Sequence, residues 1–312
     1  MTSLYGKICN EWRGMLGRVL AFVIVAVISF VGAAAQVLWR VTAKGDDGGV
    51  THTSYVLGTM HTAGTEVLDT LTGMTEALER AAVVYGEVDA SEMALSPEAM
   101  ACAIAPSDST LQRLLSPASL DSLCRYVSSF EVDGSETVKA LSRMKPAMLD
   151  AFLEVRRSGA STDMSPDIAL QHRARAMGRE VRALETAAQQ MRMLMNLPIS
   201  EQLESLMESV RAPEAAQAAS DSLVAAYHRQ DLAAIEHLLA HEMGQAYAER
   251  MLYARNRAWT AVLVPEMRRR SVLVAVGAGH LVGTQGLPKL LRDAGLDVSP
   301  VGGSARQPEQ GR

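Results

Sequence analysis

Residues 271–276 (SVLVAV) form an apolar run that enters a G-A-G-H segment at 277–280. A short apolar run that is rich in β-branched residues and ends at glycines is typical of a buried strand. Comparable runs recur along the chain, and stretches with helical spacing separate them. The candidate strands occupy residues 38–41, 54–61, 82–89, 180–185, 271–276 and 296–301. Strands that alternate with helices predict an α/β fold with a central sheet.

The helical segments are concentrated in one long part of the chain. From about residue 91 to residue 264 the spacing is mostly helical, and only the candidate strand at 180–185 interrupts it. Pro117 and Pro146 follow breaks in the pattern and suit the first turn of a helix. We therefore expect a mixed central sheet with a long, mostly helical insertion, inside one domain that covers residues 36–301.

The N-terminal stretch 19–35 carries no charge. Two arginines precede it and three alanines end it, which is the pattern of a secretory signal peptide over residues 1–35. The alternative is an uncleaved anchor, because residues 19–39 give about 21 apolar residues, enough to span a bilayer. Both interpretations place the domain outside the cytoplasm. We expect an exported protein of the periplasm or cell envelope, with possible membrane association through residues 19–39.

The composition excludes several classes of protein. Hydrophobic residues make up 48% of the chain and charged residues 21%, which excludes a disordered chain. The net charge of −5, without a basic block, argues against nucleic acid as a partner. Three cysteines are too few for a disulfide scaffold. Cys102 and Cys124 are compatible with one disulfide or with two free thiols, and the polar tail 302–312 is expected to be disordered.

Polar side chains follow four of the candidate strands. In an open α/β sheet, ligands bind beyond the carboxyl ends of the strands, so these side chains are expected to meet. Each of the two histidines stands three residues after a glycine, where the backbone turns sharply or approaches another group closely. The residues at these strand ends are His61, Glu87, Asp89, Glu185 and His280.

These residue types suit a divalent metal ion. Imidazole nitrogens and carboxylate oxygens are ligands of Zn, Mn, Fe or Co. Two histidines and one carboxylate leave coordination positions for water, and metal-bound water is a nucleophile near neutral pH. The alternative is that one or both histidines are structural residues at strand ends.

Other catalytic signatures are missing from the sequence. It contains no G-x-S-x-G, so a serine-hydrolase elbow is unsupported. His237 and His241 have the i, i+4 spacing of a helical chelate, but the H-E-x-x-H order is absent. We interpret these two histidines as part of a solvated helix face.

Seven segments together resemble a known family. They are LWRV (38–41), YVLGTMH (55–61), GEVD (86–89), MKP (144–146), ALETAAQQ (183–190), ARNRAW (254–259) and VGAGHLVGTQGL (276–287). In this order they resemble the TraB/GumN family, whose animal relatives are the Tiki metalloproteases. The resemblance extends over about residues 38–301.

The resemblance implies an α/β domain with a helical insertion and a metal centre. Carried over to this chain, the metal ligands are His61, Glu87 and His280. Arg255 and Asn256 match an R-N pair that is expected to face the same site, and Asp167 and Glu185 match positions that tend to be acidic.

These inferences combine into one functional hypothesis. We expect an exported metal-dependent hydrolase that acts on peptide or similar amide bonds, with Zn, Mn, Co or Fe as the ion. Glu185 or Asp89 is the expected general base, Arg255 the anion stabiliser and Asn256 a substrate contact. For Arg255 the alternative is a structural ion pair with Glu87, Asp89 or Glu185. The rival function is a non-catalytic metal-, haem- or peptide-binding protein of the cell envelope. The sequence does not indicate the metal, the substrate or the oligomeric state.

Overall fold

The computed structural model describes residues 36–45, 49–130, 133–158 and 165–302. The predicted signal peptide or anchor at 1–35 and nearly all of the tail at 302–312 lie outside these ranges. Within them, no helix combines the length and the apolar character needed to cross a membrane. Cys102 and Cys124 are both free thiols, so the disulfide that the sequence left open does not form in this structure.

One six-stranded mixed sheet forms the centre of the domain, in the order β4-β3-β5-β2-β1-β6. Its strands are β1 (Leu38–Lys44), β2 (Thr51–Thr59), β3 (Val83–Gly86), β4 (Glu180–Ala183), β5 (Val272–Gly277) and β6 (Asp297–Pro300). Strands β4, β3, β5 and β2 are mutually parallel, whereas β1 pairs antiparallel with both β2 and β6. The predicted α/β class with a mixed sheet is therefore confirmed. The predicted strands at 82–89 and 180–185 end earlier than expected.

The apolar run at the middle of the sheet is buried as its composition requires. Val272, Leu273 and Val274 are fully buried, since β5 is an interior strand with neighbours on both sides. Each buried Val or Leu side chain contributes about 1.5–3 kcal/mol relative to its exposed state. Strands β2 and β5 are in register at Thr59 and Gly277, so their carboxyl ends lie side by side.

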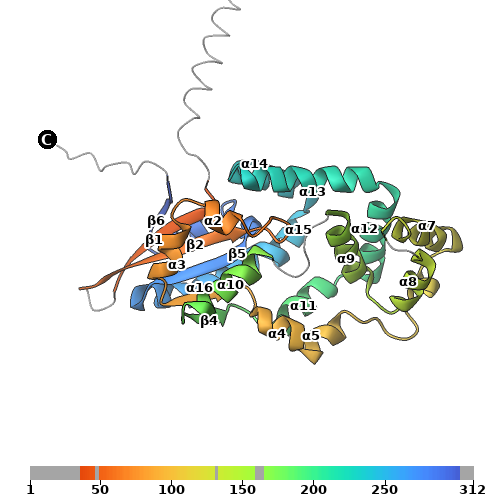
Figure 1. Cartoon of the computed structure of the whole chain (residues 1–312), viewed down its shortest axis with the longest axis horizontal. Coiled ribbons are helices and arrows are strands. Elements are labelled where there is room, and N and C mark those ends of the chain that lie inside the picture. The colour runs from red at the N-terminus through yellow and green to blue at the C-terminus, as the bar shows by residue number, and fades with distance from the viewer. Residues whose placement is uncertain (1–35, 46–48, 131–132, 159–164, 303–312) are drawn as a thin grey trace, which may run out of the picture. The chain divides into compact units, whose positions relative to one another are not determined.

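Four helical segments connect the strands (Figure 1). Between β2 and β3 lie α2 (Val67–Thr70) and α3 (Met74–Arg80). Between β3 and β4 lie α4 (Ala90–Leu95), α5 (Pro97–Cys102), α6 (Leu111–Leu114), α7 (Pro117–Val127), α8 (Gly134–Ala140), α9 (Pro146–Ser158) and α10 (Pro166–Ala176). Between β4 and β5 lie α11 (Ala187–Met195), α12 (Ile199–Arg211), α13 (Pro213–His228), α14 (Leu232–Glu242), α15 (Gln245–Ala248), a π-helix η1 (Glu249–Tyr253) and α16 (Ala254–Arg269). A 3₁₀ turn η2 (Ala278–Leu281) and α17 (Leu287–Asp293) follow β5.

The helical insertion has a hydrophobic cluster of its own. Helices α7 and α9 begin at Pro117 and Pro146, as predicted. Figure 1 shows α7, α8, α9 and α12 gathered beside one another. Their apolar faces meet in a cluster of buried residues that contains Leu123, Leu149 and Leu206. Because this cluster contains no residue of the sheet, the insertion has a hydrophobic cluster separate from the side chains that are buried in the sheet.

Candidate functional site

His280 lies in η2, directly after β5, and its side chain is almost completely buried. Its Nδ1 atom is 2.6 Å from Oδ1 of Asn256. The Nδ2 atom of Asn256 donates to the backbone oxygens of His280 (3.2 Å) and Gln285 (2.8 Å), so its Oδ1 atom is the acceptor. The proton of the imidazole is therefore on Nδ1, and Nε2 presents a lone pair to the site.

The same histidine is neutral near pH 7. Burial lowers the pKa of His280, Glu87 opposes this and the charge of Arg255 adds to it, and the net value is about 4. The ring also lies against Trp259, with centroids 4.5 Å apart. Its position and its tautomer are therefore both determined by its neighbours.

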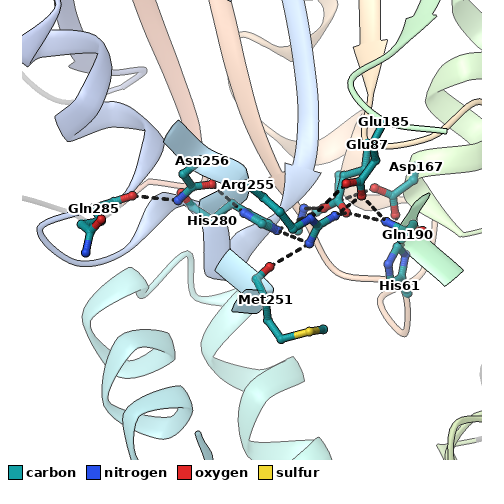
Figure 2. Close-up of polar contacts among 12 residues, drawn as sticks. His61, Glu87, Asp167, Glu185, Gln190, Met251, Arg255, Asn256, His280 and Gln285 are labelled. Atoms are coloured by element: carbon teal, nitrogen blue, oxygen red, sulfur yellow. Dashed lines mark hydrogen bonds and ion pairs between the residues drawn. The ribbon is translucent and has the colours of Figure 1, made fainter. Parts of the chain in front are cut away.

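Arg255 is the cation that joins the charged groups of the site (Figure 2). Its Nη2 atom donates to Glu87 Oε2 at 2.5 Å and to Glu185 Oε1, and its Nε atom donates to Glu185 Oε2 at 3.3 Å. Its Nη1 atom is 3.0 Å from His280 Nε2. The guanidinium thus lies between two carboxylates and one imidazole. These contacts include the ion pairs with Glu87 and Glu185 that the sequence analysis gave as the alternative role of Arg255.

The π-helix before α16 supports this position of Arg255. Five residues, Glu249–Tyr253, adopt the wider turn, which changes the direction of the residues that follow it. Nη1 of Arg255 donates to the backbone oxygen of Met251 within that turn, at 2.8 Å. The guanidinium also lies over the ring of Trp259, four residues further along, at 4.5 Å from the centroid.

Glu87 directly follows β3 and is held by three donors. Its Oε1 atom accepts from the backbone N–H of Gly277 (2.8 Å), and its Oε2 atom accepts from Arg255 and from Gln190 Nε2 (2.9 Å). Burial raises the pKa of Glu87, but the charges of His280 and Arg255 and the Gly277 N–H lower it below its ordinary value. Because His280 is neutral near pH 7, Arg255 and Gly277 are the groups that keep Glu87 ionised there.

His61 forms a separate ion pair beyond the end of β2. Its Nδ1 atom is 2.8 Å from Asp167 Oδ2, and Asp167 also accepts a hydrogen bond from Thr59. The hydrogen bond and the charge of Asp167 raise the pKa of His61 to about 9. The His61 side chain is 74% exposed, so solvent weakens the attraction without reversing its direction. The pairing with Asp167 therefore favours the protonated form of His61.

A cavity of about 350 Å³ joins the two halves of the site. Its lining consists of His61, Glu87, Val88, Ala90, Ser165, Asp167, Ile168, Gln171 and Gln190. His280 contacts Glu87 at 3.6 Å but is not part of this lining. The structure thus brings Glu87 together with each predicted histidine, on different sides of its carboxylate.

This arrangement does not form a metal-binding group. Among the residues that the structure describes, no cluster of three or more His, Cys, Asp or Glu side chains is placed to hold an ion. The guanidinium of Arg255 contacts both Glu87 and His280, and His61 pairs instead with Asp167, so the three predicted ligands do not face one point. The predicted metal centre stays a prediction.

The comparison with family models gives one assignment. The model for the TraB/PrgY/gumN family matches residues 37–300. This chain belongs to the TraB/PrgY/gumN family. No curated protein and no solved structure matches it significantly.

Asp89 and Asn256, two further predicted site residues of this TraB/PrgY/gumN family member, are not part of the cavity lining. Asp89 is the N-cap of α4, where its carboxylate accepts from the N–H of Ser91 (2.9 Å) and from Arg175 Nη2 (2.7 Å). It does not line the cavity. Asn256 is completely buried, and its side chain contacts His280.

Sequence reasoning missed three residues that shape the site in this family member. Gln190 bridges Glu87 and Glu185, Trp259 supports Arg255, and Gln171 binds the backbone of Val88 at 2.9 Å. Two signals could have found the first two. Thr186 starts α11 with a capping box, which places Gln190 in the first helical turns, and Trp259 follows Arg255 at the i+4 spacing of one helix face. No comparable signal marks Gln171.

Proposed function

We propose that this chain is a hydrolase of peptide or similar amide bonds that acts in the cavity lined by His61 and Glu87. One observation carries the proposal: the carboxylate of Glu87, whose pKa is lowered, and the imidazole of His61, whose pKa is raised, line the same cavity of about 350 Å³. A base and an acid that are held apart in pKa by their surroundings are the pair that general acid–base hydrolysis requires.

In the proposed reaction, Glu87 accepts a proton from a water molecule while the oxygen of that water attacks the amide carbonyl carbon. Protonated His61 stabilises the charge that develops on the carbonyl oxygen. The carbon–nitrogen bond then breaks, and the leaving nitrogen receives a proton from His61 or from protonated Glu87. Asp167 orients the imidazole, and Arg255 and Gln190 hold the carboxylate of Glu87 in place.

The predicted divalent ion, whether Zn, Mn, Co or Fe, remains part of the proposal. His280 and Glu87 already have the protonation states that metal ligands need, because Nε2 carries a lone pair and the carboxylate is ionised. His61 has that state only in its neutral form, in which Nδ1 shares its proton with Asp167 and Nε2 carries the lone pair. Such an ion would supply Lewis acidity. Since the donors do not surround one point, no step above runs through an ion.

The test is hydrolysis of a quenched-fluorescent peptide library by the full chain, with and without a chelator. Glu87→Gln and His61→Gln are expected to lower kcat/KM at least about 100-fold, which is the usual contribution of a general acid or base. His237→Gln, which changes an exposed histidine outside the cavity, is the matched control and is expected to leave hydrolysis unchanged. Full activity of Glu87→Gln would remove the mechanism, and the chelator decides whether an ion takes part.

One observation favours the rival function, binding without turnover. All four carboxylate oxygens of Glu87 and Glu185 already accept hydrogen bonds from Arg255, Gln190 or Gly277. Because Arg255 pairs with both carboxylates, proton transfer to Glu87 is disfavoured, which leaves binding of a metal, haem or a peptide without turnover as the second candidate. Tight binding of a library peptide that is recovered intact would favour the rival function.

We also propose export to the periplasm or cell envelope.

A further inference from the structure

Helix α10 contacts both halves of the candidate site. Its polar residues Asp167, Gln171 and Arg175 follow one another at intervals of four residues, so they lie along one face of the helix. Asp167 and Gln171 line the cavity of about 350 Å³. The proposed reaction uses Asp167 to orient His61, but it gives no role to the other two residues.

The N-terminal end of this face holds the segment that follows β2. Oδ2 of Asp167 is 2.8 Å from Nδ1 of His61 (Figure 2), and Asp167 also accepts a hydrogen bond from Thr59, the last residue of β2. Because the His61 side chain is 74% exposed, the contact with Asp167 rather than packing determines where the imidazole lies. A movement of α10 would therefore move His61.

Gln171 binds the segment that follows β3 through both ends of its amide. Its Nε2 atom donates to the backbone oxygen of Val88 at 2.9 Å, and its Oε1 atom accepts from the backbone N–H of Ala90 at 3.0 Å. The Gln171 side chain is buried. Without this amide, one backbone acceptor and one backbone donor would lose their partners in a part-buried place, which is costly.

The glycine at the end of β3 leaves the space that this amide needs. A Cβ atom on Gly86 would lie 2.5 Å from Nε2 of Gln171 and 3.0 Å from the backbone oxygen of Val88. Glycine in a strand commonly marks a close approach of another group to the backbone. Any larger residue at position 86 would therefore displace the amide of Gln171.

Arg175 adds an outer contact between α10 and the same segment. Its Nη2 atom donates to both carboxylate oxygens of Asp89, each at 2.7 Å. The Arg175 side chain is 37% exposed, so solvent screens this ion pair and its contribution is small. The buried amide of Gln171 is therefore the main polar contact between α10 and the segment after β3.

The carboxylate of Glu87 is held from the other side, by the sheet. Its Oε1 atom accepts from the N–H of Gly277 at 2.8 Å, and the backbone oxygen of Glu87 accepts from the N–H of Glu185 at 2.9 Å. Glu87 is thus fixed to the sheet, whereas His61 is fixed to α10 through Asp167. The distance between the two side chains depends on how α10 docks on the segment after β3.

We propose that Gln171 is a positioning residue, which docks α10 on the segment after β3 and thereby sets the position of His61 relative to Glu87. Both ends of its amide bind the backbone, so Gln171 acts through the helix that carries Asp167 and not on the substrate. The catalytic consequence rests on the proposed function, but the docking of the helix does not.

The first test measures the docking by hydrogen exchange and mass spectrometry on the full chain. Gln171→Met replaces the amide by an apolar side chain of similar length. It is expected to speed exchange in residues 88–91 and also in the first turn of α10, where Asp167 lies. Unchanged exchange in that turn would overturn the proposal, whether or not the chain hydrolyses peptides.

Gln202→Met is the matched control. Gln202 is another buried glutamine, and its amide also binds the backbone, with Nε2 donating to Leu197 at 2.8 Å and Oε1 accepting from Ala147 at 3.2 Å. It lies on α12 and does not line the cavity. The control is expected to lose a similar amount of stability without faster exchange in α10. Equal acceleration in the two variants would show a general loss of stability and contradict the proposal.

The second test follows hydrolysis of the best substrate from the peptide library. Gln171→Met is expected to lower kcat about tenfold or more with KM changed less than about twofold, because misplaced reacting groups slow the chemical step more than they weaken binding. Gln202→Met is expected to change neither constant. A rise in KM alone would make Gln171 a substrate contact and overturn the positioning role. A wild-type chain without hydrolysis would remove the proposed function, and the exchange result would still decide the docking.

Gly86→Ala tests the same contact from the other partner. Alone, it is expected to reproduce the faster exchange and the lower kcat of Gln171→Met, because the new Cβ atom displaces the amide. Gln171→Ala leaves room for that atom, so adding Gly86→Ala to Gln171→Ala is expected to have little further effect. Additive losses in the double variant would show that the two residues act independently and would contradict the proposal.

Discussion

At the scale of single residues, the site depends on which nitrogen of His280 carries a proton. Asn256 decides this, because its side-chain oxygen is 2.6 Å from Nδ1 while its amide group is committed to two backbone oxygens. The result is a neutral imidazole whose Nε2 lone pair faces Arg255. The same lone pair would be required for a metal ligand.

Asn256→Ala is expected to destabilise the fold by about 1–3 kcal/mol, because a buried imidazole N–H loses its acceptor. Urea denaturation measures the loss, and nitrogen chemical shifts of His280 report the change of tautomer. Asn196→Ala, at an exposed position after α11, is the control and is expected to cost much less. An equal loss in the two variants would contradict the role of Asn256.

The ion pair between His61 and Asp167 predicts a pH dependence with a definite sign. The folded pKa of His61, about 9, lies above its unfolded value of about 6.5. The stabilisation is therefore fully present below pH 6.5 and is lost as pH rises through 9. A proton NMR titration measures the pKa directly, and Asp167→Asn is expected to lower it. A wild-type pKa near 6.5 would show that the pair does not form in solution.

At the scale of secondary-structure elements, α11 connects helix capping to the site. Thr186 accepts from the N–H of Gln189 at 3.2 Å, and the Gln189 side chain accepts from the N–H of Thr186 at 2.8 Å. This reciprocal pair starts the helix that presents Gln190 to Glu87 and Glu185. A change at the cap therefore affects the position of a residue in the cavity.

Thr186→Ala is expected to cost about 0.5–2 kcal/mol in stability, as other N-cap replacements do. It is also expected to weaken peptide hydrolysis or binding in the cavity lined by His61 and Glu87, because Gln190 loses its defined position. Ser116→Ala removes a comparable cap from α7, far along the chain, where Ser116 accepts from the N–H of Ser119 at 3.2 Å. The control is expected to lose similar stability without the functional effect. A functional loss of the same size in both variants would refute the specific role of α11.

The elements also show what the sequence could and could not predict. All the candidate strands form: the β-branched apolar run of β5 is buried between two neighbours, whereas β4 and β6 are edge strands with one neighbour each. The parallel pairing of β3 with β5 brings Glu87 to Gly277 and His280, as the strand-end argument expected. The central position of Arg255 could not be derived from spacing, because it follows from a π-helical turn. The use of Asp89 as a helix cap also depends on where β3 ends, which the sequence pattern overestimated.

At the scale of the whole domain, two groups of buried side chains stabilise different parts of the described structure. Leu273 is fully buried in β5 and contacts the sheet neighbours on either side. Leu123 is fully buried in the cluster of the helical insertion. Since the insertion cluster contains no sheet residue, each group can lose stability partly on its own.

Leu123→Ala and Leu273→Ala form a matched pair that tests this division. Each is expected to cost about 2–5 kcal/mol, because both remove a buried leucine side chain. Hydrogen exchange measured by mass spectrometry is expected to show the loss of protection mainly in α7, α9 and α12 for Leu123→Ala, and mainly in β2, β3 and β5 for Leu273→Ala. If either variant lowers protection evenly over both regions, the domain unfolds as one cooperative unit. Separate responses would mean that the helical insertion can open or rearrange while the sheet still holds Glu87 and His280 in place.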